Sequence, residues 1–229
     1  LVEVFEEAGL PAGVLNLVTG PGGSVGNTLI EDPRVGGISF TGSTEVGTSI
    51  TARASELLKK VQCEMGGKNA AIILNDADLE KAVPGVVGGA FGSTGQRCTA
   101  TSRAIVEDGI YDEFMKTLIA QTTALTIGDG MDETKDVAPL SSQNQLDTVL
   151  EYIGIGTEEG AKLTFGGHHL QDGEFAEGYY VEPTIFEDVN TDMRIAQEEI
   201  FGPVLSVFRA SDLQDAIRIN NAVDFGLSS

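Results

Sequence analysis

Apolar residues recur along the chain in short continuous runs that alternate with longer segments of helical spacing. The short runs predict strands over 14–18, 37–40, 61–65, 70–74, 104–107 and 204–208, with further strands near residues 162 and 181. The helical spacing predicts helices over 24–31, 44–60, from a cap at 76–78 towards 92, and over 111–125, 143–159 and 213–221. Strands that alternate with helices in this way predict an α/β protein with mostly parallel sheets.

The character of the chain changes between residues 60 and 65. Before this point, two strand–turn–helix units each carry glycine where the strand ends, which suits phosphate binding. After it come the candidate reactive side chains. We therefore expect two domains, 1–62 and 63–229. The chain starts inside a helical pattern without an initiator methionine and stops without a closing helix or strand, which predicts that it is part of a longer protein.

Acidic residues dominate the charge balance. The chain has 35 Asp and Glu against 14 Lys and Arg, a formal net charge of −21. Such a surface repels nucleic acid and anionic membranes, so we exclude both as partners. The acids are dispersed between periodic apolar segments, which indicates a folded protein adapted to high salt; a merely acidic surface is the alternative. No apolar run is long enough for a membrane span, and we do not expect the first residues, which lack a basic region before an apolar run, to be a signal peptide.

Two cysteines, Cys63 and Cys98, are the only thiols, and neither belongs to a metal-binding pattern. We expect both to be reduced and the protein to be cytoplasmic. Small residues flank Cys98, and Arg97 and Arg103 could favour its thiolate, the form that attacks a carbonyl. The alternative is a buried structural cysteine. Cys63 lies in an apolar pattern and is expected to be a small core residue.

The turn at 40–47 follows a predicted strand and opens a helix. Gly42 allows close approach of the backbone, and Ser43 or Thr44 caps the helix, whose N-terminus suits a pyrophosphate. An ordinary tight connection would need the same residue types. The histidine pair at 168–169 lies in a glycine-rich polar loop and is interpreted as surface.

Carboxylates occur at two further positions that suit chemistry. Glu64 ends a predicted buried strand and could be a general base, although a salt bridge to Lys68 is an alternative. Glu198 and Glu199 precede an aromatic residue and a Gly-Pro turn. A carboxylate there could hold a ribose diol, and Phe201 could border a nicotinamide ring. The alternative is an acidic helix end followed by a strand.

Five segments occur in an order that resembles the aldehyde dehydrogenase superfamily: 9–18, 40–47, 64–68, 95–98 and 198–203. Cys98 also follows Glu64 at the separation that the family shows. The resemblance extends over the whole chain. It implies an aldehyde dehydrogenase-like fold, in which 1–62 is the later part of a Rossmann-like NAD(P)-binding domain. Residues 63–229 would be most of the catalytic domain.

The resemblance also implies roles for single residues. Cys98 would be the nucleophile that forms a thiohemiacetal and then a thioester, and Glu64 the base that activates water. The cofactor, NAD or NADP, would contact Gly42, Ser43, Gly47, Met65, Gly66, Glu199 and Phe201. The backbone N–H of Cys98 would supply half of an oxyanion hole. The other half, an Asn side chain, and the residues that choose between NAD and NADP would lie upstream.

The sequence around Cys98 narrows the expected substrate. Gln-Arg-Cys-Thr-Ala at 96–100 resembles members that act on short semialdehydes, including 2-oxoglutarate semialdehyde dehydrogenases. Arg97 could steer a substrate carboxylate or have a structural role. We expect a homo-oligomer, a dimer or tetramer, and no metal. A CoA-acylating dehydrogenase is disfavoured by Glu64, whereas a part of an enzyme that binds nucleotide only weakly remains the second hypothesis.

Overall fold

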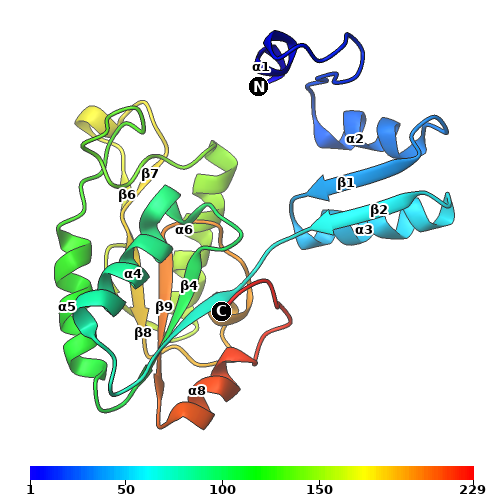
Figure 1. The fold of residues 1–229 in the computed structure, drawn as a ribbon. Helices are drawn as coiled ribbons and strands as arrows, with labels where there is room; N and C mark the ends of the chain where they lie inside the picture. Colours follow the sequence, from blue (N-terminus) through cyan, green and yellow to red (C-terminus); the bar gives the residue numbers. More distant parts are fainter. The chain divides into compact units, whose positions relative to one another are not determined.

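The structure, a computed structural model, describes residues 1 to 229, and the chain forms two compact units, Leu1–Met65 and Gly66–Ser229 (Figure 1). The first unit ends at Met65 instead of residue 62, because strand β2 (Lys60–Glu64) keeps pairing with β1 (Gly37–Thr41) as far as Glu64. Helices and strands alternate, so the fold is α/β as predicted.

The first unit is a parallel pair of strands with helices around it. Strands β1 and β2 alternate with helices α2 (Gly22–Glu31) and α3 (Thr44–Glu56), after a short helix α1 (Val2–Glu7). The strand predicted over 14–18 is wrong, because these residues are exposed and pair with no other strand. An apolar run becomes a strand only where a neighbour satisfies its backbone groups.

Helix α3 is shorter than predicted. It ends at Glu56 instead of residue 60, and Leu58 takes a left-handed φ of 54°. The Lys59 ammonium donates to the carbonyls of Ile30 and Asp32, where α2 ends. A cation at those free carbonyls stabilises the helix end. Because Lys59 is held at the end of α2, α3 ends before it, and β2 starts at the next residue, Lys60.

The second unit is built on a five-stranded sheet. Its order is β3 (Asn69–Ile73), β4 (Thr101–Glu107), β9 (Val204–Ala210), β8 (Thr184–Glu187) and β5 (Lys162–Phe165). The first four strands are parallel, and β5 runs antiparallel to β8. Strand β8 was not predicted, since it is short and directly follows a proline. The small hairpin strand β6 (His169–Leu170), which pairs with β7 (Tyr180–Val181), was not predicted either.

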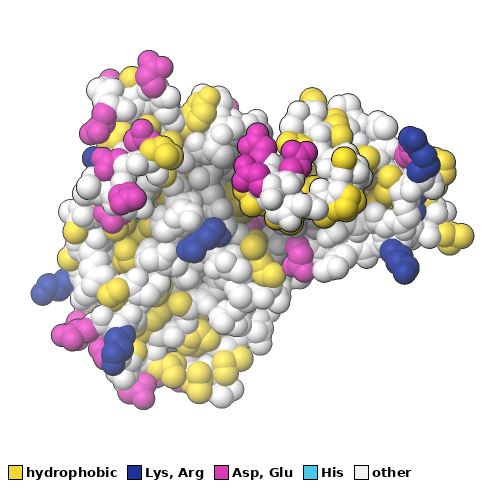
Figure 2. Space-filling model, turned by 45° about the horizontal axis from the view of Figure 1, so that its top comes forward, with side chains coloured by type: hydrophobic (Ala, Val, Ile, Leu, Met, Phe, Trp, Pro, Cys, Tyr) yellow, Lys and Arg dark blue, Asp and Glu magenta, His cyan; other side chains and the backbone are white.

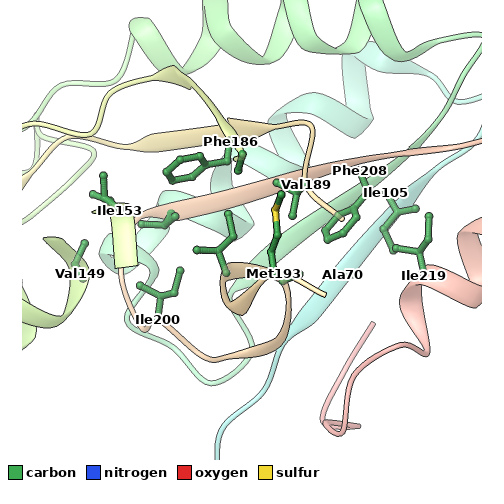
Figure 3. Packing of buried hydrophobic residues seen from close by; sticks show 14 of the residues in the cluster. Ala70, Ile105, Val149, Ile153, Phe186, Val189, Met193, Ile200, Phe208 and Ile219 are labelled. Atoms are coloured by element: carbon green, nitrogen blue, oxygen red, sulfur yellow. The ribbon is translucent and has the colours of Figure 1, made fainter. Parts of the chain in front are cut away.

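Helices cover both faces of this sheet. On one face α4 (Leu79–Phe91) and α5 (Tyr111–Thr123) pack on alternate strand residues such as Ala104 and Leu205. On the other face α6 (Gln143–Glu158), α7 (Arg194–Gln197) and α8 (Leu213–Asn220) pack on residues such as Ile105 and Phe208 (Figure 3). Strand residues face alternate sides, so β4 and β9 contribute to both cores. None of the helices has the length and apolar character to span a lipid bilayer.

Candidate active site

Cys98 lies on a tight turn between α4 and β4. A short turn, η1 (Gly92–Gly95), follows α4, and the 97–100 turn comes next, closed by the Ala100 N–H that donates to the Arg97 carbonyl at 3.0 Å. Cys98 and Thr99 are the central residues of this turn, and both are exposed. Neither Cys98 nor Cys63 is in a disulfide. Because Cys98 is exposed, the alternative that it is a buried structural cysteine is wrong.

The segment before Cys98 has an unusual backbone. Ser93, Thr94 and Gly95 all take left-handed φ values of 52°, 58° and 66°. For a β-branched residue such as Thr94 this conformation is a real outlier and costs about 1–2 kcal/mol. Two contacts hold the segment in place: the Thr94 hydroxyl donates to the Ala138 carbonyl at 2.8 Å, and the Gln96 side chain accepts from the Ser141 N–H at 2.9 Å.

A buried amide holds the other side of the turn. Nδ2 of Asn69, at the start of β3, donates to the carbonyls of Cys98 at 2.7 Å and of Ala100 at 3.0 Å. Together with the contacts of Thr94 and Gln96, this anchors every second residue from 94 to 100. Asn69 was not among the predicted site residues, because nothing in the sequence shows that β3 starts beside the turn.

The turn also packs tightly against the 198–203 loop. A Cβ on Gly95 would stand 2.1 Å from the Gly202 carbonyl oxygen, so only glycine fits. Phe201, with a left-handed φ of 56°, is half-exposed, and the side chain of Gln145 donates to its carbonyl at 3.0 Å. The two segments predicted to carry the nucleophile and the ribose ligand are therefore neighbours in the second unit.

Glu199 points towards the start of the second unit. Its carboxylate accepts from the Gly67 N–H at 3.2 Å, and a Cβ on Gly66 would stand 2.1 Å from one carboxylate oxygen. Burial raises the pKa of Glu199. A small cavity of about 20 Å³, room for about one water, lies beside it. Its lining includes Gly67, Gly95, Arg97, Ala100, Glu199 and Phe201.

Glu198 has a different environment from its neighbour. It accepts hydrogen bonds from Arg194 at 2.9 Å and from the Tyr152 hydroxyl at 2.5 Å. The hydrogen bond from Arg194 is the main reason that the pKa of Glu198 is lowered. Its carboxylate is thus engaged in an ion pair, and Glu199 alone of the two acids lines the cavity.

The two arginines near Cys98 are held by backbone carbonyls. Arg97 is exposed and donates to the Gly88 carbonyl of α4 at 3.3 Å. Arg103 is 2% exposed, and its three nitrogens donate to the carbonyls of Lys68, Ile219 and Asn220, the last two at the end of α8. The expectation that Arg103 acts on the thiolate is therefore replaced by a structural role that ties β3, β4 and α8 together.

Lys68 is buried in the second unit. Its ammonium has no hydrogen-bond partner, and it takes part in no salt bridge. Burial, with a smaller contribution from the charge of Arg103, lowers its pKa to about 7, whereas Glu199 and Glu198 act in the opposite direction. The salt bridge to Lys68 that was considered as an alternative role for Glu64 is therefore wrong.

The first unit carries the other predicted residues at the carboxyl ends of β1 and β2. Glu64 is exposed, and β2 is only half-buried, so the expectation of a buried strand at this carboxylate is wrong. The Glu64 carbonyl accepts from the Gly42 N–H at 3.1 Å. Carboxyl ends of parallel strands form the edge where α/β proteins bind ligands.

Ser43, at the same edge, is the N-cap of α3 and accepts from the Val46 N–H at 3.4 Å. The neighbouring glycines pack closely against side chains of the same unit. A Cβ on Gly42 would meet the Phe40 ring at 2.4 Å, and one on Gly47 would meet the Met65 sulfur at 2.6 Å. These contacts give both glycines a place in the packing of the unit, and their cofactor role stays a prediction.

Two further residues have local partners. The Cys63 thiol is half-buried and lies 3.4 Å from the Thr51 hydroxyl under α3, which is consistent with a structural role. His168 is exposed and pairs with Glu182 at 2.6 Å, as a surface histidine would.

The sequence profile of the aldehyde dehydrogenase family matches residues 1–229. The chain belongs to this family. It is 51% identical over 229 residues to an alpha-ketoglutaric semialdehyde dehydrogenase of Bacillus subtilis and 46% identical over 230 residues to an alpha-ketoglutarate semialdehyde dehydrogenase of Haloferax volcanii. All of the chain, but only 47% of each relative, is covered, so the chain spans about half of their length.

Solved structures agree with this assignment. Betaine aldehyde dehydrogenase of Staphylococcus aureus, crystallised in complex with NAD⁺, matches with a TM-score of 0.95 at 35% identity, over 99% of this chain and 45% of that one. An NAD-dependent aldehyde dehydrogenase of Sinorhizobium meliloti matches with a TM-score of 0.94 at 39% identity, over 99% and 44%. The aldehyde dehydrogenase fold predicted from the five segments is thereby confirmed.

In this aldehyde dehydrogenase chain, the predicted site residues form one group in each unit. The second unit brings the Cys98 turn, Gly66, Glu199 and Phe201 together, and the first unit gathers Gly42, Ser43, Gly47, Glu64 and Met65 at one sheet edge. Asn69, Thr94 and Gln96 are additional contributors. Their roles depend on contacts between segments distant in the sequence, which no local pattern indicates.

Proposed function

We propose that the complete protein oxidises an aldehyde to a carboxylic acid with NAD or NADP, using Cys98 as the nucleophile. The observation that carries this proposal is an exposed thiol on a turn anchored at alternate residues, packed against the loop of Glu199 and Phe201. Fixed geometry of this kind is what covalent catalysis requires. The names of the relatives support the reaction class.

The residues present fit a dinucleotide. The missing Cβ of Gly66 leaves room for the Glu199 carboxylate, whose free oxygen can accept hydrogen bonds from a ribose diol, and half-exposed Phe201 can lie against the nicotinamide. In the first unit, the N-terminus of α3 at Ser43 suits the diphosphate, near Gly42, Gly47 and Met65. When bound, the nicotinamide ring accepts the hydride. We assign the first unit, predicted as 1–62, to the cofactor domain and the second unit, predicted as 63–229, to the catalytic domain.

The chain's own groups supply the remaining steps. The Cys98 thiolate attacks the aldehyde carbon, and the backbone N–H of Cys98 stabilises the resulting oxyanion of the thiohemiacetal. Loss of hydride from that carbon leaves a thioester on Cys98. Glu64 takes a proton from water, the hydroxide adds to the thioester, and the C–S bond breaks to release the acid and the Cys98 thiolate.

The substrate class follows from the relatives and from Arg97. We infer a short semialdehyde that bears a carboxylate at the end opposite its aldehyde, as in 2-oxoglutarate semialdehyde. The guanidinium of Arg97 is exposed and uses only Nη2 on the Gly88 carbonyl, so other donors remain for a carboxylate. We further propose a cytoplasmic homo-oligomer, a dimer or tetramer. The dispersed acidic groups on the face in Figure 2 support adaptation to high salt.

The decisive experiment follows formation of reduced cofactor by the complete protein with semialdehyde substrates. Cys98→Ser should lower kcat at least about a thousandfold, roughly 4 kcal/mol of barrier. Cys63→Ser is the matched control and should stay within a few fold of wild type. Covalent labelling of Cys63 alone by an aldehyde-competitive thiol reagent would contradict the assignment, and acyl-CoA as the product would replace the hydrolytic step.

A further inference from the structure

Asn69 is a buried polar side chain whose hydrogen bonds all serve the turn around Cys98 and one other segment. It is 5% exposed, and Nδ2 donates to the carbonyls of Cys98 and Ala100. Its Oδ1 accepts from the Ser228 N–H at 3.2 Å. Both amide hydrogens and one oxygen lone pair are thus used. A buried amide with both of its donors engaged is held in one orientation, and removing those donors would take this partner from the carbonyls of Cys98 and Ala100.

The position of the clamped carbonyl matters more than the number of bonds. Cys98 and Thr99 are the two central residues of the 97–100 turn, so the Cys98 carbonyl belongs to the central peptide. Rotation of this peptide is what interconverts type I and type II turns. Asn69 holds the carbonyl on the buried side. Because C=O and N–H point in opposite directions in a trans peptide, the Thr99 N–H is directed to the other, exposed side.

We propose that Asn69 is the positioning residue that fixes the central peptide of the nucleophile turn. It keeps the carbonyl dipole away from the exposed side and keeps the Thr99 N–H on the side where a thiolate and an oxyanion would form. This inference rests on the proposed role of Cys98 as the nucleophile. Asn69 touches no reacting atom and acts only through the backbone of Cys98 and Ala100.

Asn69→Asp is the sharpest perturbation. It keeps the size of the side chain and the acceptor for the Ser228 N–H, but it replaces the donor by an oxygen that repels both carbonyls. Asn69→Ser keeps one hydroxyl donor and should be intermediate. Asn144→Asp, on the exposed surface of α6, adds the same charge elsewhere and is the matched control.

Two measurements on the complete protein test the proposal. The first is the rate at which iodoacetamide alkylates Cys98, followed by peptide mass spectrometry, with Cys63 as the internal reference. Because the thiolate is the reactive form, Asn69→Asp should slow Cys98 alkylation about tenfold and leave Cys63 unchanged. The second is steady-state kinetics, in which kcat should fall about thirtyfold, roughly 2 kcal/mol, while KM stays within about threefold.

The two proposals fail in different ways. A complete protein that forms no reduced cofactor would refute the proposed function alone. Alkylation of Cys98 needs no aldehyde, so it would still test the role of Asn69. A folded Asn69→Asp variant with wild-type alkylation and kcat overturns the positioning role. So does a lowered melting temperature with unchanged Cys98 alkylation, which would show a purely structural residue. If Asn69→Asp does not fold, Asn69→Ser is judged by the same criteria.

Discussion

Replacing Gly95 by alanine tests whether the contact between the Cys98 turn and the 198–203 loop is as tight as the structure shows. The added Cβ would stand 2.1 Å from the Gly202 carbonyl oxygen and 3.0 Å from that of Ala90. Both neighbours are backbone atoms, so no side chain can rotate away. Gly95 also has a φ of +66°, which disfavours alanine even where space is free.

The expected cost has two parts. A left-handed alanine costs about 1–2 kcal/mol, and forcing the loop outward costs about 1–3 kcal/mol, as for other overpacked sites. We expect a loss of about 2–5 kcal/mol in the free energy of unfolding. To relieve the clash between the new Cβ and the Gly202 carbonyl, the loop that carries Phe201 must also move away from the Cys98 turn. A displacement of about 1 Å at a reacting group lowers the rate about a hundredfold, so kcat should fall by that factor.

Denaturant unfolding and steady-state kinetics of the complete protein measure both effects. Gly85→Ala in α4 is the matched control, because a Cβ there meets nothing within 4 Å. It should be neutral or stabilise the protein by about 0.5–1 kcal/mol, since glycine weakens a helix. If Gly95→Ala unfolds within about 0.5 kcal/mol of wild type and keeps its kcat, the packing argument is refuted.

Three other expectations follow from the site and the surface. Glu64→Gln should slow steady turnover more than the first burst of reduced cofactor if Glu64 acts on the thioester; equal losses in rapid-mixing traces would point to thiol activation instead. Burial lowers the pKa of Lys68 to about 7, so between about pH 7 and the unfolded pKa of 10.5 the unfolded chain holds a proton that the folded chain has released. The free energy of unfolding should therefore rise with pH across this range. Lys68→Met should flatten that part of the pH dependence of the melting temperature, and an unchanged slope would contradict the shift. The acidic surface predicts that the melting temperature rises with KCl concentration. The rise should be steep to about 0.1 M, where the Debye length has shrunk to about 10 Å, and any further rise should come from exclusion of salt from the surface. A melting temperature that is flat or falls up to 2 M KCl would remove the salt-adaptation hypothesis.

The alternation of elements was predictable because it depends on local spacing. Helices α2, α5, α6 and α8 and strands β1 to β4 and β9 lie close to where the apolar pattern puts them. The false strand at 14–18 shows the limit of that method, since an apolar run does not reveal whether a partner strand lies next to it. The early end of α3 was missed for a similar reason, because Lys59 binds carbonyls of α2.

The site divides in the same way. Cys98, Glu64 and Glu199 could be singled out because their residue types carry chemistry. Asn69 and Gly95 could not, because the importance of each comes from one contact made by residues far apart in the sequence. The burial of the strand that carries Glu64 was also mispredicted, since β2 has a partner on one edge only.

The anchoring of alternate residues from 94 to 100 has a consequence for covalent inhibition. A thiol on a flexible loop can be approached from many directions, so the rate at which a reagent inactivates it depends mainly on the intrinsic electrophilicity of that reagent. Here hydrogen bonds from Thr94, Gln96 and Asn69 hold the loop, and Gly95 is wedged against Gly202. The approach trajectory to Cys98 is therefore restricted. Warheads of equal solution reactivity but different shape should differ widely in inactivation rate, so selective reagents can be sought by varying their geometry.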